Sequence, residues 1–399
     1  MVLIGIVGGP NKGKSTFFKA ATLADAEIAN YPFTTIKPNS GVSFVRVKCP
    51  EKEFNLKCSP NHGFCIRGNR FLPVKLLDVA GLVPDAHLGK GLGNEFLSDL
   101  SQADALIHIV DVSGSTTEKG EPCEAGTYDP CNDIRFLEEE IDLWFDNILV
   151  KSCSKFAKRT TLESKDEDKE IAEQFSGLKI DLGMVKDARK KTELTKKIKD
   201  WSEDEVKNFA KQLRIVSKPI IIAANKVDIP CAEANLKIIK EKFPDLKIIP
   251  CSSEAELALK EAAKHELVEY IPGEKEFKVL AEDKLNEKQK KGLEFVKKFL
   301  DKWGSTGVQD CLNLAVFEEL DYIVAYPVED GNKFSDNKGN VFPDGFLLRK
   351  GSNALDLAYA VHSAIGDKFI KAIDARTKQV IGKEHTLKNN DIIEIVSGK

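Results

Sequence analysis

The sequence predicts an α/β protein in which a doubly wound, mostly parallel sheet carries a helical insertion and is followed by a small α+β domain. Three observations predict it. Short apolar runs alternate with helical patterns along most of the first 275 residues. This alternation is interrupted by a Lys/Glu-rich stretch with sparse apolar positions at 151–213. From 321 onwards, short strand patterns surround a single amphipathic helix.

The individual elements follow from these patterns. Four of the six early strand runs are almost wholly apolar, which is typical of strands buried on both faces. Strands are expected at 2–7, 42–47, 74–77, 105–112, 219–224 and 247–250, and helices at 14–24, 93–102, 132–150, 233–243 and 254–264. Further helices are expected at 284–303, 308–318 and 353–364, and further strands at 322–328, 345–349, 368–375 and 391–396. We therefore divide the chain into a nucleotide domain (1–150 and 214–275), an insertion (151–213), a helical connector (276–320) and a C-terminal domain (321–399).

Composition narrows the class of protein. The 399 residues are 42% hydrophobic and 31% charged, and no apolar run reaches the length of a membrane span. The first residues form a strand pattern without a basic leader, so we expect a cytoplasmic protein. We also expect no membrane partner and a monomeric state. The net charge of −4 gives no strong basic excess that would indicate nucleic acid. Abundant lysine with only two methionines favours a thermophilic source.

A phosphate-binding motif lies between the first strand and the first helix. The segment 8–16 reads Gly-Gly-Pro-Asn-Lys-Gly-Lys-Ser-Thr, which fits G-x4-G-K-[ST] in the context that a P-loop NTPase requires. Its backbone N–H groups and the helix start would surround phosphate, Lys14 would reach the β- and γ-phosphates, and the Ser15 hydroxyl would bind Mg²⁺. The predicted nucleotide-binding residues here are Gly8, Pro10, Asn11, Lys12, Gly13, Lys14, Ser15 and Thr16.

Two further segments would sense the γ-phosphate. Asp78 ends an apolar strand and Gly81 follows shortly after it, so the carboxylate would hold Mg²⁺ while the Gly81 N–H approaches the γ-phosphate. Between the phosphate loop and Asp78, the loop 30–39 offers a hydroxyl for Mg²⁺, for which Thr35 is the first choice and Thr34 the second. The predicted catalytic residues are Lys14, Thr35 and Gly81, and the predicted metal ligands are Ser15, Thr35 and Asp78.

The base is predicted to be guanine. Asn225-Lys226-Val227-Asp228 follows an apolar strand. Guanine presents N1–H and an exocyclic amine as paired donors, and the Asp228 carboxylate can accept both, whereas adenine would leave this carboxylate unsatisfied. Asn225 would join this loop to the phosphate loop, the Lys226 stem would lie on the base, and Ser252 and Ser253 would offer backbone N–H groups to guanine O6.

At these residues the sequence resembles the Obg-like branch of translation-associated GTPases, close to the YchF group. The resemblance is carried by the phosphate loop, by 30–39 and 78–86, and by the Gly-rich segment 89–97. The C-terminal residues 342–345, 356–363 and 387–391 resemble a TGS domain, a β-grasp, ubiquitin-like module. The resemblance implies a GTPase with GTP/GDP and Mg²⁺, working as a conformational switch that engages ribosomes or RNA.

Two departures from relatives refine this expectation. Members of the YchF group often carry an altered base motif and favour ATP, whereas here the intact motif predicts GTP. Leu82 stands where Ras-like proteins have the glutamine that orients water, so we expect slow intrinsic hydrolysis that a partner or an ion accelerates. Asn11 matches a residue that binds K⁺ in some relatives, although a turn role is equally open. The alternatives to a switch are an interaction scaffold with negligible turnover and a P-loop kinase of a small molecule.

Other candidate sites stay open. Cys49, Cys58, His62 and Cys65 lie within one short segment and could be reduced thiols, form a disulfide such as Cys58–Cys65, or bind zinc, which is the least favoured of the three. Cys123 and Cys131 could also pair. His108 is expected in the core, and His87 has a small chance of lying near phosphate. Lys-rich stretches at 186–199 and 284–302 are expected to be solvated helix faces that could contact RNA.

Overall fold

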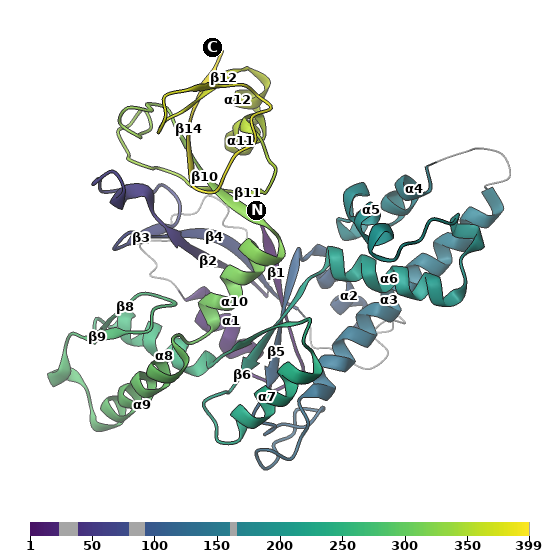
Figure 1. Cartoon of the computed structure of the whole chain (residues 1–399). Coiled ribbons are helices and arrows are strands. Elements are labelled where there is room, and N and C mark those ends of the chain that lie inside the picture. Colours follow the sequence, from purple (N-terminus) through teal and green to yellow (C-terminus); the bar gives the residue numbers. More distant parts are fainter. Residues whose placement is uncertain (24–38, 80–91, 160–165, 399) are drawn as a thin grey trace.

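The computed structural model describes residues 1–23, 39–79, 92–159 and 166–398, and for 92–95 and 152–159 it describes the backbone alone. Thr34, Thr35, Gly81, Leu82 and His87 therefore lie outside the described residues. Figure 1 shows a central sheet with helices on both of its faces, a helical arm on one side, and a separate small sheet near the C-terminus.

The central sheet confirms the predicted doubly wound α/β fold. Its strands lie in the order β2-β4-β1-β5-β6-β7, with β3 paired to β4. The strands are β1 (Leu3–Val7), β2 (Ser40–Lys48), β3 (Phe64–Ile66), β4 (Asn69–Asp78), β5 (Ala105–Asp111), β6 (Ile220–Asn225) and β7 (Lys247–Pro250). The neighbouring strands β4, β1, β5, β6 and β7 pair in parallel, whereas β2 and β3 are antiparallel to β4. All residues of β5 and β6 are buried, as their apolar runs predict.

Two hydrophobic clusters cover the two faces of this sheet. On β5, Leu106 and Val110 belong to the first cluster, while Ile107 and Ile109 belong to the second, as strand alternation requires. The first cluster packs against α2 (Leu92–Gln102), α3 (Cys131–Arg159), α6 (Glu203–Ser217), α7 (Ala232–Lys242) and α8 (Ser253–Lys264). The second packs against α1 (Lys14–Thr22) and α10 (Val308–Asn313).

The insertion is helical, and α3 runs through the expected boundary at 150. It continues through α4 (Glu167–Gln174) and α5 (Leu182–Lys191), and α6 leads back to the sheet. A capping box formed by Ser202 and Glu205 starts α6 and satisfies two helix-end donors. Figure 1 shows these helices projecting away from the sheet as one arm.

The connector differs from a purely helical segment. A hairpin of β8 (Val268–Tyr270) and β9 (Phe277–Val279) precedes α9 (Glu287–Trp303), and α10 continues as a π-helical turn at Leu314–Glu319. The hairpin and β3 were missed because strands of three residues show too little alternation to be recognised in a sequence. Among the described residues, no helix is both long and apolar enough to span a bilayer.

The C-terminal domain is a five-stranded sheet in the order β11-β10-β14-β12-β13. Its elements are β10 (Tyr322–Val328), β11 (Phe346–Arg349), α11 (Ala354–Val361), α12 (Ser363–Asp367), β12 (Phe369–Asp374), β13 (Val380–Ile381) and β14 (Asp391–Ser397). One face packs on α11, and residues of β10 join the second cluster of the central domain. The small domain is therefore docked on the central domain through an apolar core as well as polar contacts.

Candidate functional site

The phosphate loop connects β1 to α1 and can adopt its shape only with glycine at two positions. Gly8 has a φ of 154°, and a Cβ there would lie 2.7 Å from the carbonyl oxygen of Ile109. Gly13 has a φ of 97°, and its Cβ would lie 2.1 Å from the Asn225 side-chain nitrogen. Because both positions exclude a side chain, the loop presents backbone to the site, as a phosphate cradle requires.

The ammonium of Lys14 and the carboxylate of Asp78 meet at the start of α1. The Lys14 Nζ donates to Asp78 Oδ1 and, over 3.0 Å, to the carbonyl of Val79. Both side chains are partly exposed, at 16% and 22%. Ser15 and Thr16 lie in the first turn of α1, where backbone N–H groups lack intrahelical partners. The structure thus brings the predicted phosphate-binding lysine and the predicted Mg²⁺ carboxylate together beside free helix-end donors.

Asn225 joins the end of β6 to both neighbouring loops. Its side-chain nitrogen donates to the carbonyl of Lys12 over 3.0 Å. Its Oδ1 accepts from the backbone N–H of Ser253 over 3.0 Å and from the Ser253 hydroxyl over 2.9 Å. Only 3% of Asn225 is exposed, so these bonds are shielded from water. This one side chain therefore fixes the phosphate loop, the base motif and the start of α8 relative to one another.

Lys226 contacts the phosphate loop as well as a carboxylate that the sequence analysis missed. Its Nζ donates to the carbonyl of Asn11 over 3.1 Å and to Asp111 Oδ2 over 2.8 Å. Burial opposes ionisation of Asp111, but bonds from Lys226, Ser113 and Thr116 outweigh it and lower its pKa. The signal for Asp111 in the sequence is an acidic residue at the end of an apolar strand, followed by several hydroxyl residues.

Lys12 does not present its side chain to the pocket. The side chain is fully buried, and its ammonium lies 2.8 Å from Asp133 Oδ2, donates to the Thr116 carbonyl over 3.0 Å, and lies 4.3 Å from the Tyr128 ring centre. The prediction of Lys12 as a nucleotide-binding residue is therefore restricted to its backbone. Its side chain instead anchors the phosphate loop on α3.

Asn11 holds a second loop against the phosphate loop. It has a φ of 59°, and its side-chain nitrogen donates to the Gly120 carbonyl over 2.9 Å. Gly120 in turn lies so close to Pro10 that a Cβ would approach that ring within 2.8 Å. Of the two roles considered for Asn11, the structure displays the turn role.

The predicted base side of the pocket needs a correction. The Ser252 N–H donates to the Thr306 carbonyl over 2.9 Å, and the Ser253 N–H donates to Asn225, so both N–H groups expected to reach guanine O6 are engaged inside the protein. A cavity of about 370 Å³ opens beside Asp228, Ser252 and Glu254. Glu254 lies in the first turn of α8, where N–H groups have no intrahelical partner, and its N–H is the next donor along the chain.

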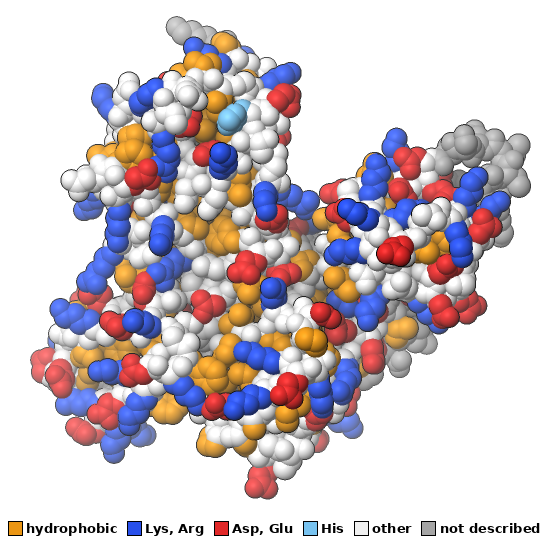
Figure 2. Space-filling model, viewed as in Figure 1, with side chains coloured by type: hydrophobic (Ala, Val, Ile, Leu, Met, Phe, Trp, Pro, Cys, Tyr) orange, Lys and Arg blue, Asp and Glu red, His pale blue; other side chains and the backbone are white. Residues whose placement is uncertain are grey.

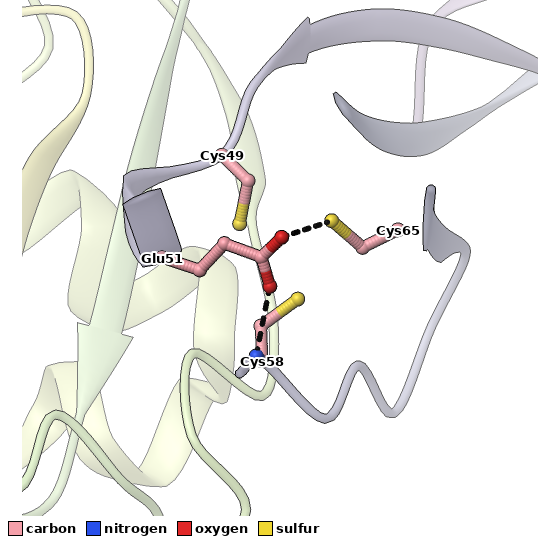
Figure 3. Close-up of side chains that lie close together, drawn as sticks. All are labelled: Cys49, Glu51, Cys58 and Cys65. Carbon is pink, nitrogen blue, oxygen red and sulfur yellow. Dashed lines mark hydrogen bonds between the residues drawn. The ribbon is translucent and has the colours of Figure 1, made fainter. Parts of the chain in front are cut away.

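Cysteines gather near the far end of β2, in an arrangement that differs from the predicted one. Ligand atoms of Cys49, Glu51, Cys58 and Cys65 lie within 4.8 Å of one another. His62 is not part of this group, and its Nδ1 lies 2.6 Å from Asp344 Oδ1. Figure 3 shows the three thiols and the Glu51 carboxylate pointing toward a common centre. Hydrogen bonds from Cys58 and Cys65 lower the pKa of Cys49.

The structure also bears on the two possible disulfides and on His108. The described cysteines are free thiols, so neither Cys58–Cys65 nor Cys123–Cys131 is bonded in this structure. His108 is 2% exposed on β5, and burial lowers its pKa to about 3. It is a neutral core residue, as its position in an apolar run indicates.

Three family models match separate parts of the chain. A "50S ribosome-binding GTPase" model matches residues 3–134. The model of the "Obg-like GTPase YGR210-like, G4 motif-containing domain" matches 223–330, and the TGS domain model matches 338–397. In chain order, the three matched regions contain the phosphate loop, the base motif and most of the small C-terminal sheet.

Individual relatives give the same result, one of them over the whole length. A GTP-binding protein of Methanocaldococcus jannaschii is 51% identical across 100% of this chain and 99% of its own. The Obg-like ATPase 1 of Homo sapiens is 32% identical over 67% of this chain and 65% of its own.

Solved structures agree. A GTP-binding protein from Pyrococcus horikoshii OT3 shares 38% identity with a TM-score of 0.79 over 100% of both chains. The Schizosaccharomyces pombe YchF GTPase shares the fold, with 22% identity and a TM-score of 0.59 over 99% of this chain and 97% of its own. The chain therefore belongs to the Obg-like, YchF-type GTPase family, with a YGR210-like domain around its base motif and a TGS domain at its C-terminal end.

Proposed function

We propose that this protein binds GTP and hydrolyses it to GDP as a conformational switch. The observation that carries the proposal is the convergence of Lys14 and Asp78 beside a phosphate loop that Asn225 ties to the base motif. A triphosphate on this loop would draw Lys14 away from Asp78 toward the β- and γ-phosphates, where its charge stabilises the transferring phosphoryl group. Asp78 would then be free to help hold a metal ion.

Mg²⁺ suits the donors present, because carboxylate and hydroxyl oxygens are the ligands it prefers. Asp78 and Ser15 would hold it, together with Thr35 in the undescribed loop, and the bound ion would neutralise charge on the phosphate oxygens. The chain itself supplies backbone donors around the phosphates and a lysine on the γ-phosphate side. With Leu82 in place of a water-orienting glutamine, we expect slow turnover that K⁺ at Asn11 or a partner accelerates.

Guanine selection rests on Asp228, which lines the cavity beside Ser252 and Glu254. The carboxylate can accept from both guanine donors, and the Glu254 N–H, which is the next backbone donor after Ser252 and Ser253, would serve O6. This assignment matters because some relatives, including the human protein, are named ATPases. Competition of GTP, GDP and ATP for a fluorescent guanine nucleotide tests it directly. Equal affinity for ATP and GTP would overturn the assignment.

The partner of the switch is proposed to be the ribosome or another RNA. The family model that matches 3–134 carries ribosome binding in its description, and the TGS domain offers a second surface. Figure 2 shows Lys and Arg intermixed with Asp and Glu over the visible face, rather than gathered into one basic patch.

Co-sedimentation with ribosomes tests this partner and separates the alternatives. A switch binds ribosomes more tightly with a non-hydrolysable GTP analogue than with GDP, and ribosomes raise its hydrolysis rate. A scaffold would bind equally in both states without turnover. A kinase would transfer phosphate to a small molecule and ignore ribosomes. Parallel hydrolysis assays in KCl and NaCl show whether K⁺ contributes.

A further inference from the structure

We propose that Cys49, Cys58, Cys65 and Glu51 form a zinc site that braces the contact between the GTPase domain and the TGS domain. The four ligand atoms lie within 4.8 Å of one another without a bound ion. In a tetrahedral zinc site with metal–sulfur distances near 2.3 Å, neighbouring sulfurs lie about 3.8 Å apart. Closing the group around an ion therefore needs side-chain shifts of about 1 Å or less.

The ligand chemistry favours zinc. Three thiolates with a carboxylate are a soft donor set that suits Zn²⁺ far better than Mg²⁺ or Ca²⁺. Cys49 and Cys58 are 5% and 8% exposed, so the site is closed on one side and fits a structural role. Glu51 is already oriented, because its Oε2 accepts from the Cys58 backbone N–H over 2.9 Å. The Glu51 carboxylate is thus oriented toward the three thiols, where it would be the fourth zinc ligand.

An independent observation is a buried cation beside the cysteines. Arg70 pairs across the β3–β4 ladder with Cys65 and is completely buried. Its terminal nitrogens donate to the carbonyls of Phe342 and Pro343, each over 3.0 Å, while its Nε has no partner among the described atoms. Within the described part of the chain, the guanidinium thus bonds to neutral carbonyls and not to a carboxylate. A buried charge without a counter-ion is costly.

A metal centre would supply that counter-ion. Zn²⁺ with three thiolates and one carboxylate carries a net charge of −2, which attracts Arg70 and accepts hydrogen bonds through sulfur. The buried Tyr326 hydroxyl also lacks a partner among the described atoms, and Tyr326 belongs to the same hydrophobic cluster as Cys49 and Cys58. Arg70 on β4 and Tyr326 on β10 thus place one orphaned donor in each of the two domains that the proposed centre joins.

The position of the site gives its role. The ligands lie on the segment 49–65, which carries the backbone contacts to the TGS domain: Ser59 N–H to the Val341 carbonyl over 2.8 Å, and Asn61 N–H to the Pro343 carbonyl over 2.7 Å. This segment has little regular structure between η1 (Pro50–Lys52) and β3. An ion bound by all four ligands would fix the two ends and the middle of this segment relative to one another. It would therefore hold Ser59 and Asn61 in place against the TGS domain.

The test begins with zinc content. The full-length protein, purified under reducing conditions from zinc-supplemented cells, should contain one zinc per chain by elemental analysis. Cys58→Ser and Cys65→Ser should lose it, whereas Cys231→Ser, which changes an exposed cysteine outside the group, should keep it. Replacement by Co²⁺ should give the strong visible absorption of a tetrahedral thiolate site. Glu51→Gln should keep cobalt bound but shift that spectrum.

A second measurement covers variants that fail to fold. Removing zinc from the wild-type protein with a chelator should accelerate hydrogen exchange at Ser59 and Asn61 at least tenfold, and adding Zn²⁺ but not Mg²⁺ should restore protection. Zinc at background level in reduced protein, equal zinc in wild type and Cys65→Ser, or a Cys58–Cys65 disulfide by mass spectrometry would each overturn the proposal. Exchange unchanged by chelation would remove the bracing role.

Discussion

Replacing Lys12 with methionine tests whether this residue supports the phosphate loop from beneath. The substitution keeps an unbranched side chain but leaves Asp133, which is 8% exposed, without its ion pair. Removing one partner of a buried pair costs about 3–5 kcal/mol. Asp133 keeps the hydroxyl of Tyr128 at 2.8 Å, which limits the loss. With Tyr128 holding the ion-pair cost at or slightly below the lower end of that range, and the lost bond to the Thr116 carbonyl adding about 1 kcal/mol, we expect a total of about 3–4 kcal/mol.

Hydrogen exchange is the suitable assay, because a chain with three hydrophobic clusters need not unfold in one step. A cost of 3–4 kcal/mol corresponds to exchange about 100- to 1000-fold faster at the start of α3. The double variant Lys12→Met/Asp133→Asn removes both charges and should cost less than the sum of the two single variants. Exchange within twofold of wild type in Lys12→Met, or strictly additive effects, would refute the anchoring role.

The pH dependence of this defect follows from Asp133. Burial raises its pKa above the ordinary 3.8, even though Lys12 opposes this. A carboxyl with a raised folded pKa stabilises the fold fully at pH values below its unfolded pKa, and that contribution is lost as pH rises through the folded pKa. The Lys12→Met defect should therefore be largest near neutral pH and should shrink as the pH falls through the folded pKa of Asp133, where the carboxyl takes up a proton.

Four further substitutions probe the site and the domain contact. Lys14→Met should weaken GTP about 10- to 100-fold more than GDP in titration calorimetry; an equal loss for both would contradict its γ-phosphate role. Gly13→Ala, whose Cβ meets the Asn225 amide at 2.1 Å, should lower nucleotide affinity at least tenfold, whereas Gly177→Ala, which has open space, should not. Asp228→Asn should lose GTP affinity by about 100-fold or more and gain xanthosine triphosphate, whose C2 carbonyl can accept from the new amide; retained GTP selectivity would exclude Asp228 from base recognition. Arg70→Leu should lower stability by about 2–4 kcal/mol and expose the TGS domain to limited proteolysis. Unchanged proteolysis would show that the two bonds to the Phe342 and Pro343 carbonyls are dispensable.

The parts predicted well from the sequence are those that local pattern decides. Strands β1, β5, β6 and β7 begin and end within one or two residues of their apolar runs, because buried parallel strands are continuously apolar. The helices that connect these strands are predicted in the same way, from apolar residues that recur at helical spacing. Strands of two or three residues, such as β3 and β13, exist because a neighbour offers pairing, and nothing in their own residues signals it.

The site residues divide along the same line. Short motifs located Lys14, Asp78 and Asn225, whose meeting depends on the known geometry of one fold. Two roles needed three-dimensional information. Spacing alone grouped His62 with the cysteines, but the chain turns it toward Asp344, 282 residues away, and brings Glu51 into the group instead. Lys12 looked like a phosphate ligand by its position, yet the arrival of α3 beneath the loop gives its ammonium a better partner in Asp133.

The β2–β4 ribbon connects the nucleotide site to the TGS domain. Its nine paired residues extend about 30 Å, from Ser40 opposite Leu77 to Lys48 opposite Asn69. At the nucleotide end, the Asp78 N–H donates to the Asn39 carbonyl over 2.7 Å. At the other end, Arg70 and the cysteine segment bond to the TGS domain. The ribbon is therefore a continuous hydrogen-bonded connection between the nucleotide end and the TGS contact.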